Sequence, residues 1–136
     1  MMACRGSWPG LWLALGAAGV ALAAQPAPSA ARGEQLYARC VACHALAVDR
    51  VGPRHCGVLG RRAGSVAGFD YSPAMKKSGI VWSEKTLDLF LTKPQRMVPG
   101  SSMTYDGVAE AQDRADLIAY LKAAASGTQC AKSTRS

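Results

Sequence analysis

Two cysteines and a histidine stand together at Cys40-Val41-Ala42-Cys43-His44, a C-x-x-C-H arrangement. Cysteines three positions apart lie on one face of a helical turn, so both thiols can add across the two vinyl groups of one haem edge. The histidine that follows then points its imidazole at the iron. The spacing predicts that Cys40 and Cys43 attach one c-type haem covalently and that His44 is an iron ligand.

Other chemistries are open to the same pair of cysteines. A thioredoxin-like redox pair belongs to a βαβ unit, and no such pattern surrounds Cys40 and Cys43. A four-thiolate zinc site with Cys56 and Cys130 would need a second closely spaced pair, which those two do not form. The pair could also be disulfide-bonded or simply buried. Covalent haem attachment is the interpretation that the five residues favour.

Residues 1–24 have the features of a secretory signal. Arg5 precedes a mostly apolar run, 11–24, in which small residues such as Ala23 stand at the end. The run is shorter than the ~18 apolar residues of a membrane-spanning helix, and no second such run follows. We expect cleavage near Ala23 or Ala24, export to the periplasm and no stable membrane insertion afterwards. The alternative is an uncleaved leader that serves as an anchor.

Cleavage after Ala24 leaves 112 residues, enough for one modest domain and too few for two. A stretch rich in proline and alanine opens this part of the chain. We therefore expect a flexible lead-in over 25–31, a folded domain over 32–126 and a C-terminal tail over 127–136.

The charge of those 112 residues is positive. They hold fifteen Lys and Arg side chains against nine Asp and Glu side chains, formally +6. No dense basic run occurs, and few aromatic side chains are interleaved with the basic ones, so no nucleic-acid partner is indicated. A positive surface does suit docking onto an acidic protein or an anionic membrane.

The hydrophobic pattern predicts helices and no strand. Apolar residues recur at helical spacing from Gly33 to about Ala45. A glycine-rich connection over 51–68 is expected to lack regular structure, and so is the segment 93–107. Serine caps, a proline at a first helical position and stops at glycine or proline mark three further helices. They are expected from Pro73 to Gly79, from Ser83 to Pro94 and from Ala109 to about Ser126.

Further landmarks accompany the haem motif in a fixed order and spacing. They are Gly52-Pro53, Gly60-Arg61, Gly68-Phe69-Asp70-Tyr71-Ser72, Ile80-Val81-Trp82, Pro94, Pro99-Gly100-Ser101-Ser102-Met103, and Arg114 leading to Asp116-Leu117-Ile118-Ala119-Tyr120-Leu121. With these, the chain resembles the monohaem class I cytochromes c, of the mitochondrial-like bacterial kind, from about Gly33 to Ala125. The resemblance implies an all-α cytochrome c fold: three main helices plus short helices and long loops wrapped around one haem.

The resemblance also implies a second axial ligand. The residue types alone do not choose among Met75, Met97 and Met103, because methionine is a common core residue. Only Met103 follows the Pro-Gly turn of the family, so it is expected to ligate the iron opposite His44. Such ligation raises the reduction potential and leaves no open position for oxygen or peroxide.

Several other residues have family roles. Pro53 would offer its backbone carbonyl to the second ring nitrogen of the haem histidine. Arg61, Tyr71 and Trp82 resemble the groups that hydrogen-bond or neutralise the buried haem propionates. Gly33, Leu36 and Tyr120 resemble the contact between the first and last helices.

The chain departs from the family at two kinds of position. Gln95 and Ser102 stand where relatives that dock on acidic partners carry lysines, whereas Arg39 and Arg96 remain. Cys56 and Cys130 form an even pair left after haem attachment, which suggests a disulfide in an oxidising compartment; two free thiols are the alternative. His55 has no family role and is interpreted as a solvated loop residue.

These observations predict a monomeric one-electron carrier that shuttles between larger redox proteins in the periplasm. One alternative is an electron-entry subunit of a specific dehydrogenase or oxidase. Another is a peroxidase-like haem enzyme with a weak or absent sixth ligand, which ligation by Met103 would exclude.

Overall fold

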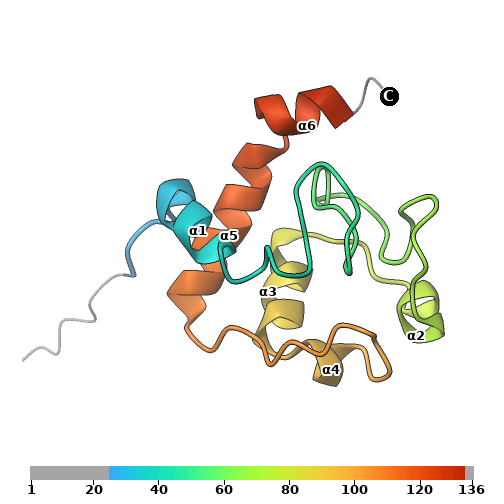
Figure 1. Ribbon diagram of the computed structural model, residues 1–136. Coiled ribbons are helices and arrows are strands. Elements are labelled where there is room, and N and C mark those ends of the chain that lie inside the picture. Colours follow the sequence, from blue (N-terminus) through green and yellow to red (C-terminus); the bar gives the residue numbers. More distant parts are fainter. Residues whose placement is uncertain (1–24, 134–136) are drawn as a thin grey trace, which may run out of the picture.

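The computed structural model describes residues 25–133, and all of their regular elements are helices (Figure 1). In chain order these are α1 (Ala30–Tyr37), α2 (Pro73–Lys77), α3 (Glu84–Thr92), α4 (Pro94–Met97), α5 (Ala111–Ala124) and α6 (Thr128–Ser133). The only pairing of extended backbone in this part of the chain is an isolated bridge between Arg62 and Val81. The expected all-α architecture is confirmed. No helix within residues 25–133 is long and apolar enough to cross a bilayer.

Helices α1 and α5 cross closely, and glycine makes the crossing possible (Figure 1). A Cβ placed on Gly33 would lie 2.0 Å from the Asp116 carbonyl oxygen and 2.8 Å from the Tyr120 Cβ. Nearby, the rings of Tyr37 and Tyr120 lie 5.2 Å apart. The implied contact between the first and last helices through Gly33 and Tyr120 is therefore confirmed.

A fully buried carboxylate joins the start of α1 to α5. Asp116 has 0% exposure, and its Oδ1 accepts hydrogen bonds from the Ser29 backbone N–H at 2.7 Å and from the Gln112 side chain at 3.0 Å. The Arg32 guanidinium lies 3.4 Å from Asp116 Oδ2 and also pairs with Asp113. Burial of this charge is compensated by an opposite charge and by hydrogen bonds.

Helix α1 lies earlier in the chain than predicted. It begins at Ala30 because the Ser29 hydroxyl caps it by accepting the Arg32 N–H. It ends at Tyr37 rather than near Ala45, because the following hydrogen bonds join residues three apart, including Cys40 N–H to the Tyr37 carbonyl at 2.8 Å. The C-x-x-C-H residues therefore lie in a tight turn after the helix.

The middle helices follow their sequence signals, with one correction. Ser72 caps α2, which has Pro73 at its first position, and a reciprocal capping box of Ser83 and Thr86 starts α3. The segment 93–107 was predicted to be irregular, but α4 lies within it. Proline explains both observations, because it cannot continue α3 yet is preset for the first turn of another helix.

Helix α5 is shorter than the predicted span by two residues at each end. The Arg114 guanidinium accounts for the later start, because its Nη1 donates to the carbonyls of Val108 and Ala109 at 2.9 and 2.7 Å. Those carbonyls are thereby bonded to a side chain instead of to helix N–H groups. The region predicted as a tail contains α6, so regular structure continues beyond Gly127.

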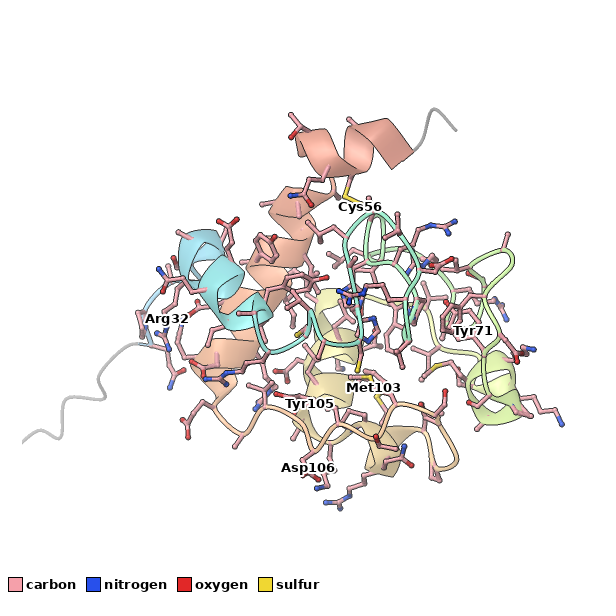
Figure 2. All side chains as sticks on the ribbon, in the orientation of Figure 1. Arg32, Cys56, Tyr71, Met103, Tyr105 and Asp106 are labelled. Carbon is pink, nitrogen blue, oxygen red and sulfur yellow. A yellow bond between two sulfur atoms is a disulfide. The ribbon has the colours of Figure 1, made fainter. Side chains whose placement is uncertain are left out.

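A disulfide ties the glycine-rich connection to α6 (Figure 2). Cys56 and Cys130 are bonded, with their Cα atoms 5.4 Å apart, and they lie 74 positions apart in the sequence. The suggested pairing of these two cysteines is confirmed. Residues 51–68 form no helix, as predicted.

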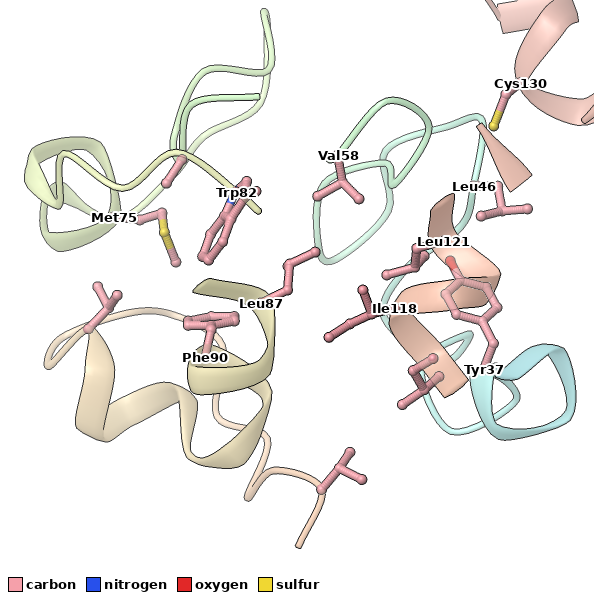
Figure 3. Packing of buried hydrophobic residues seen from close by; sticks show 14 residues of the cluster. Tyr37, Leu46, Val58, Met75, Trp82, Leu87, Phe90, Ile118, Leu121 and Cys130 are labelled. Carbon is pink, nitrogen blue, oxygen red and sulfur yellow. The ribbon is translucent and has the colours of Figure 1, made fainter. Parts of the chain in front are cut away.

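The hydrophobic core is built from the helices and from the loops between them (Figure 3). Met75, Trp82 and Phe90 pack in one part of it, and the Trp82 and Phe90 rings lie 4.9 Å apart. Ile118 and Leu121 of α5 lie in another part. Loop residues contribute directly to burial, since Leu46 and Val58 also belong to the cluster.

Candidate functional site

The His44 side chain is fixed by backbone groups of the loop that follows it. Its Nδ1 donates to the Pro53 carbonyl at 2.8 Å, which is the contact that the resemblance implied. A neutral imidazole that donates from Nδ1 has its lone pair on Nε2, the atom suited to bind a metal. Burial lowers the pKa of His44, and the hydrogen bond to Pro53 opposes that shift. The neutral, ligating form of the ring is therefore favoured.

Gly52 lies directly against this ring. A Cβ at position 52 would be 2.2 Å from Cε1 of His44 and 2.6 Å from each ring nitrogen. The Gly52 N–H donates to the Cys43 carbonyl at 2.7 Å, which holds the loop against the C-x-x-C-H turn. Only glycine fits at this position without moving the imidazole.

Cys40 and Cys43 are both free thiols, the first half-buried and the second exposed. Burial raises the pKa of the Cys40 thiol, and the nearby Arg39 partly offsets the effect. Cys56 and Cys130 are bonded to each other, so the four-thiolate zinc interpretation is wrong. No cluster of three or more His, Cys, Asp or Glu side chains that could hold a metal occurs within residues 25–133.

Met103 is partly buried and packs against the hydrophobic core (Figure 2). Its backbone is held at both ends: its N–H donates to the Ser101 hydroxyl at 3.2 Å, and its carbonyl accepts from Gln95 Nε2 at 2.7 Å. By contrast, Met75 is a buried member of the core cluster, with 8% exposure. Met97 packs against the same cluster.

Arg61, Tyr71 and Trp82 are brought together. The backbone N–H of Trp82 donates to the Arg61 backbone carbonyl at 2.9 Å, next to the bridge between Arg62 and Val81. Tyr71 and Arg61 interact electrostatically, but burial is the main effect on both: it raises the pKa of Tyr71 and lowers that of Arg61. Trp82 as a whole residue is 8% exposed, and among the described residues none accepts a hydrogen bond from its indole N–H.

The Arg61 guanidinium bonds two loop carbonyls, a role that the sequence did not indicate. Its Nη1 donates to the Cys56 carbonyl at 3.0 Å and its Nη2 donates to the Arg54 carbonyl at 2.8 Å. Part of the guanidinium therefore holds the loop that carries Pro53, in addition to any contact with an anion.

His55 is not a solvated loop residue, contrary to the expectation. Its ring stacks on that of His44, with centroids 4.2 Å apart and planes 22° apart, and its Nδ1 lies 3.0 Å from the Tyr37 hydroxyl. Burial, with further contributions from His44 and Arg61, lowers the pKa of His55 to about 3. The sequence offered only its position two residues after Pro53, which does not reveal the stacking partner.

These residues fit a covalently held haem. Two free thiols stand three positions apart beside an imidazole whose Nε2 is left for a metal, and Gly52 leaves room for that ring. The indole N–H of Trp82 is a hydrogen-bond donor suited to a propionate. A thioether from Met103 is a soft ligand for iron.

Comparisons with known proteins show which family the chain is similar to. The family model described as cytochrome c matches residues 30–125. Cytochrome c2 of Rhodomicrobium vannielii is 47% identical over 93 residues, covering 66% of this chain and 74% of that protein. Cytochrome c2 of Blastochloris viridis is 43% identical over 108 residues, covering 74% and 85% respectively.

Among solved structures, cytochrome cH from Methylobacterium extorquens superposes with a TM-score of 0.69 at 41% sequence identity. The match covers 70% of this chain and 98% of that one.

Proposed function

Because the chain belongs to the cytochrome c family, whose members are electron carriers with one covalently bound c-type haem, we propose that it passes single electrons between larger redox proteins in the periplasm. Its role is that of a carrier and not of an enzyme. The haem supplies the iron that gains and loses the electron, and the protein supplies orientation, burial and ligands.

The residue roles are part of the proposal. Cys40 and Cys43 would attach the haem covalently, and His44 and Met103 would bind its iron. The observation that carries this assignment is the hydrogen bond from His44 Nδ1 to the Pro53 carbonyl, 2.8 Å long, beside two free thiols. It fixes the tautomer and the ring direction and leaves Nε2 for the iron.

The remaining residues act on the surroundings of the haem. Trp82 and Tyr71 are proposed to donate hydrogen bonds to the propionates, and Arg61 to lower the cost of burying those anions. The support is that the backbone of Trp82 bonds that of Arg61 and that the Arg61 and Tyr71 side chains interact electrostatically, although two donor groups of Arg61 already bind loop carbonyls.

Periplasmic location has two independent supports. Residues 1–24, which lie outside the described part of the chain, have the composition of a cleavable leader. The disulfide between Cys56 and Cys130 suits an oxidising compartment. A chain exported in this way would act as a free monomeric shuttle.

Docking is proposed to depend less on charge than in relatives ringed by lysines. Of the two arginines that remain near the expected docking face, Arg39 lies 3.6 Å from Asp113, while Arg96 is exposed. Gln95, at a position where such relatives carry lysine, bonds inward to the Met103 loop.

The test is the optical spectrum of the holoprotein, oxidised and reduced, alongside Met103→Ala. A weak far-red band in the oxidised wild type that disappears in the variant supports ligation by His44 and Met103, and with it the carrier function. A high-spin wild type that binds carbon monoxide readily, with a spectrum unchanged by the substitution, would overturn the proposal.

A further inference from the structure

Gln95 makes two hydrogen bonds to the loop that carries Met103. From α4, its Nε2 donates to the Ser101 carbonyl at 2.5 Å and to the Met103 carbonyl at 2.7 Å. A side-chain amide has two N–H groups on this nitrogen, so both carbonyls can be bonded at once. One half-buried side chain therefore spans from α4 to the backbone of the proposed iron ligand.

The loop has few other hydrogen bonds to hold it. The Ser101 N–H donates to the Val98 carbonyl at 3.0 Å, and the Met103 N–H donates to the Ser101 hydroxyl. Both of these bonds join residues within the turn itself. The two bonds of Gln95 differ from them because they tie the turn to a helix.

Residues 101–110 have no helix or strand of their own, so the position of Met103 depends on such ties. A side chain that bonds the carbonyl of Met103 limits how far its Cα can move. The thioether, three bonds beyond that Cα, can then leave the iron only if the loop shifts or the side chain changes rotamer.

Resting on the proposed ligation by Met103, we propose that Gln95 is a positioning residue that protects the methionine ligand against displacement. Gln95 does not contact the sulfur. It acts through the Met103 carbonyl and the Ser101 carbonyl, so that displacement of the thioether by an outside ligand must also strain or break its two hydrogen bonds.

This role explains why a residue at a position used for docking in relatives is turned inward. A lysine ammonium there would favour water and an acidic partner, whereas the neutral amide can remain bonded to carbonyls in a half-buried place. Compared with a chain that carries lysine at this position, this chain has one charged side chain fewer for docking and two more hydrogen bonds to the loop that carries Met103.

The experiment titrates the oxidised holoprotein with imidazole and follows the far-red band that reports the methionine ligand. Gln95→Leu removes both donors at similar volume, and Gln95→Glu keeps the shape but cannot donate while ionised. Gln35→Leu, an exposed glutamine of α1, is the matched control. Each net hydrogen bond is equivalent to roughly a fivefold change in an equilibrium constant, so both Gln95 variants, which lose two such bonds, should bind imidazole about 25-fold more tightly.

The outcomes distinguish failure of the proposed role of Gln95 from failure of the proposed ligation by Met103. If the wild type shows the band but both Gln95 variants bind imidazole within about twofold of it, this inference alone is overturned, even where the variants unfold more easily. If the wild type lacks the band, or Met103→Ala keeps it, the proposed ligation is overturned and the role of Gln95 with it. Tighter binding in both variants and an unchanged Gln35→Leu would support the proposal.

Discussion

At the scale of single residues, the imidazole of His44 is held from three sides. The Pro53 carbonyl accepts from Nδ1, the Gly52 backbone lies against the ring, and His55 stacks on it. As the proposed iron ligand, an imidazole held in this way would keep one orientation when the charge on the iron changes. Little rearrangement is then needed when an electron arrives or leaves.

Gly52→Ala tests the second of these contacts. The added Cβ would lie 2.2 Å from His44 Cε1, so the imidazole must move or the loop must open. We expect a loss of about 3 kcal/mol in the free energy of unfolding, measured with urea on the holoprotein.

The matched control is Gly57→Ala. Position 57 has φ +66° but nothing within 4 Å of an added Cβ, so backbone strain of about 1 kcal/mol is the only expected cost. Equal losses at the two positions would show that the contact with His44 is not what requires glycine.

His55 and Tyr37 should behave as a coupled pair. His55→Leu leaves the Tyr37 hydroxyl without its partner in buried surroundings, at a cost of about 1–3 kcal/mol. Because Tyr37→Phe removes the same hydrogen bond, the double variant should lose less stability than the sum of the two single variants. Urea unfolding of the four proteins gives the coupling energy, expected at about 1 kcal/mol.

Tyr120→Phe supplies the comparison for that cycle. Its ring also lies near Tyr37, but its hydroxyl makes no hydrogen bond to the described residues. Its effect should add to that of His55→Leu. Coupling of the same size in both cycles would contradict the assignment of the hydrogen bond.

The sequence indicated those candidate site residues that belong to a short motif or to a family landmark. The C-x-x-C-H spacing marked the thiols and the imidazole, and the resemblance supplied the Pro53 carbonyl. It did not predict the stacking of His55 or the inward bonds of Gln95. Both depend on how a loop folds back on another segment, and no local periodicity records that.

At the scale of elements, the disulfide links the glycine-rich connection, which has no regular structure, covalently to a helix. Cys56 lies in the glycine-rich connection that also carries Pro53 and His55, and its partner Cys130 lies in α6. Arg61, which belongs to the same connection, further stabilises it by donating hydrogen bonds to the carbonyls of Cys56 and Arg54.

Replacing both cysteines, as Cys56→Ala with Cys130→Ala, should lower the free energy of unfolding by about 4 kcal/mol. The reason is the long closed segment, 74 positions, which greatly restricts the unfolded chain. The double variant also avoids a stray thiol that could compete for the haem. Urea unfolding with and without a thiol reductant is the measurement.

In that measurement, with the haem iron reduced in every sample, the thiol reductant should destabilise the wild type by a similar amount and leave the double variant unchanged. A reductant effect on the double variant would mean that another bond is being broken.

The sequence predicted where most helices occur better than it predicted the residues at which they begin and end. Serine caps and prolines placed α2 and α3 correctly, because those signals act through local hydrogen bonds. The start of α5 and the end of α1 were misplaced. In α5 the decisive group is the Arg114 side chain on two carbonyls, and in α1 it is a switch to tighter turns. Neither is visible in hydrophobic spacing.

At the scale of the whole molecule, the structure limits where the mature chain can begin. The Ser29 backbone N–H bonds the buried Asp116 carboxylate, and the Ser29 hydroxyl caps α1. A cut beyond Ser29 would leave that carboxylate with one partner fewer. The mature terminus should therefore precede Ser29.

Intact mass spectrometry of the protein exported by a host with haem-attachment machinery checks this. We expect the mass of residues 25–136 plus one haem, less the two hydrogens lost in the disulfide. A mass that includes residues 1–24 would instead show a retained leader. A mass without haem would contradict covalent attachment at Cys40 and Cys43.

The disulfide also has a consequence for how the protein is assembled. A chain that crosses a membrane from its N-terminus presents Cys40, Cys43 and Cys56 before Cys130. The first thiols that Cys56 can meet are therefore the wrong ones. A thioether does not exchange with thiols, so once the haem has taken Cys40 and Cys43, Cys130 is the one cysteine after residue 24 still able to pair with Cys56. Early haem attachment would thus leave Cys130 as the partner of Cys56. Delayed attachment would allow disulfides between the wrong cysteines, which an isomerase would have to rearrange.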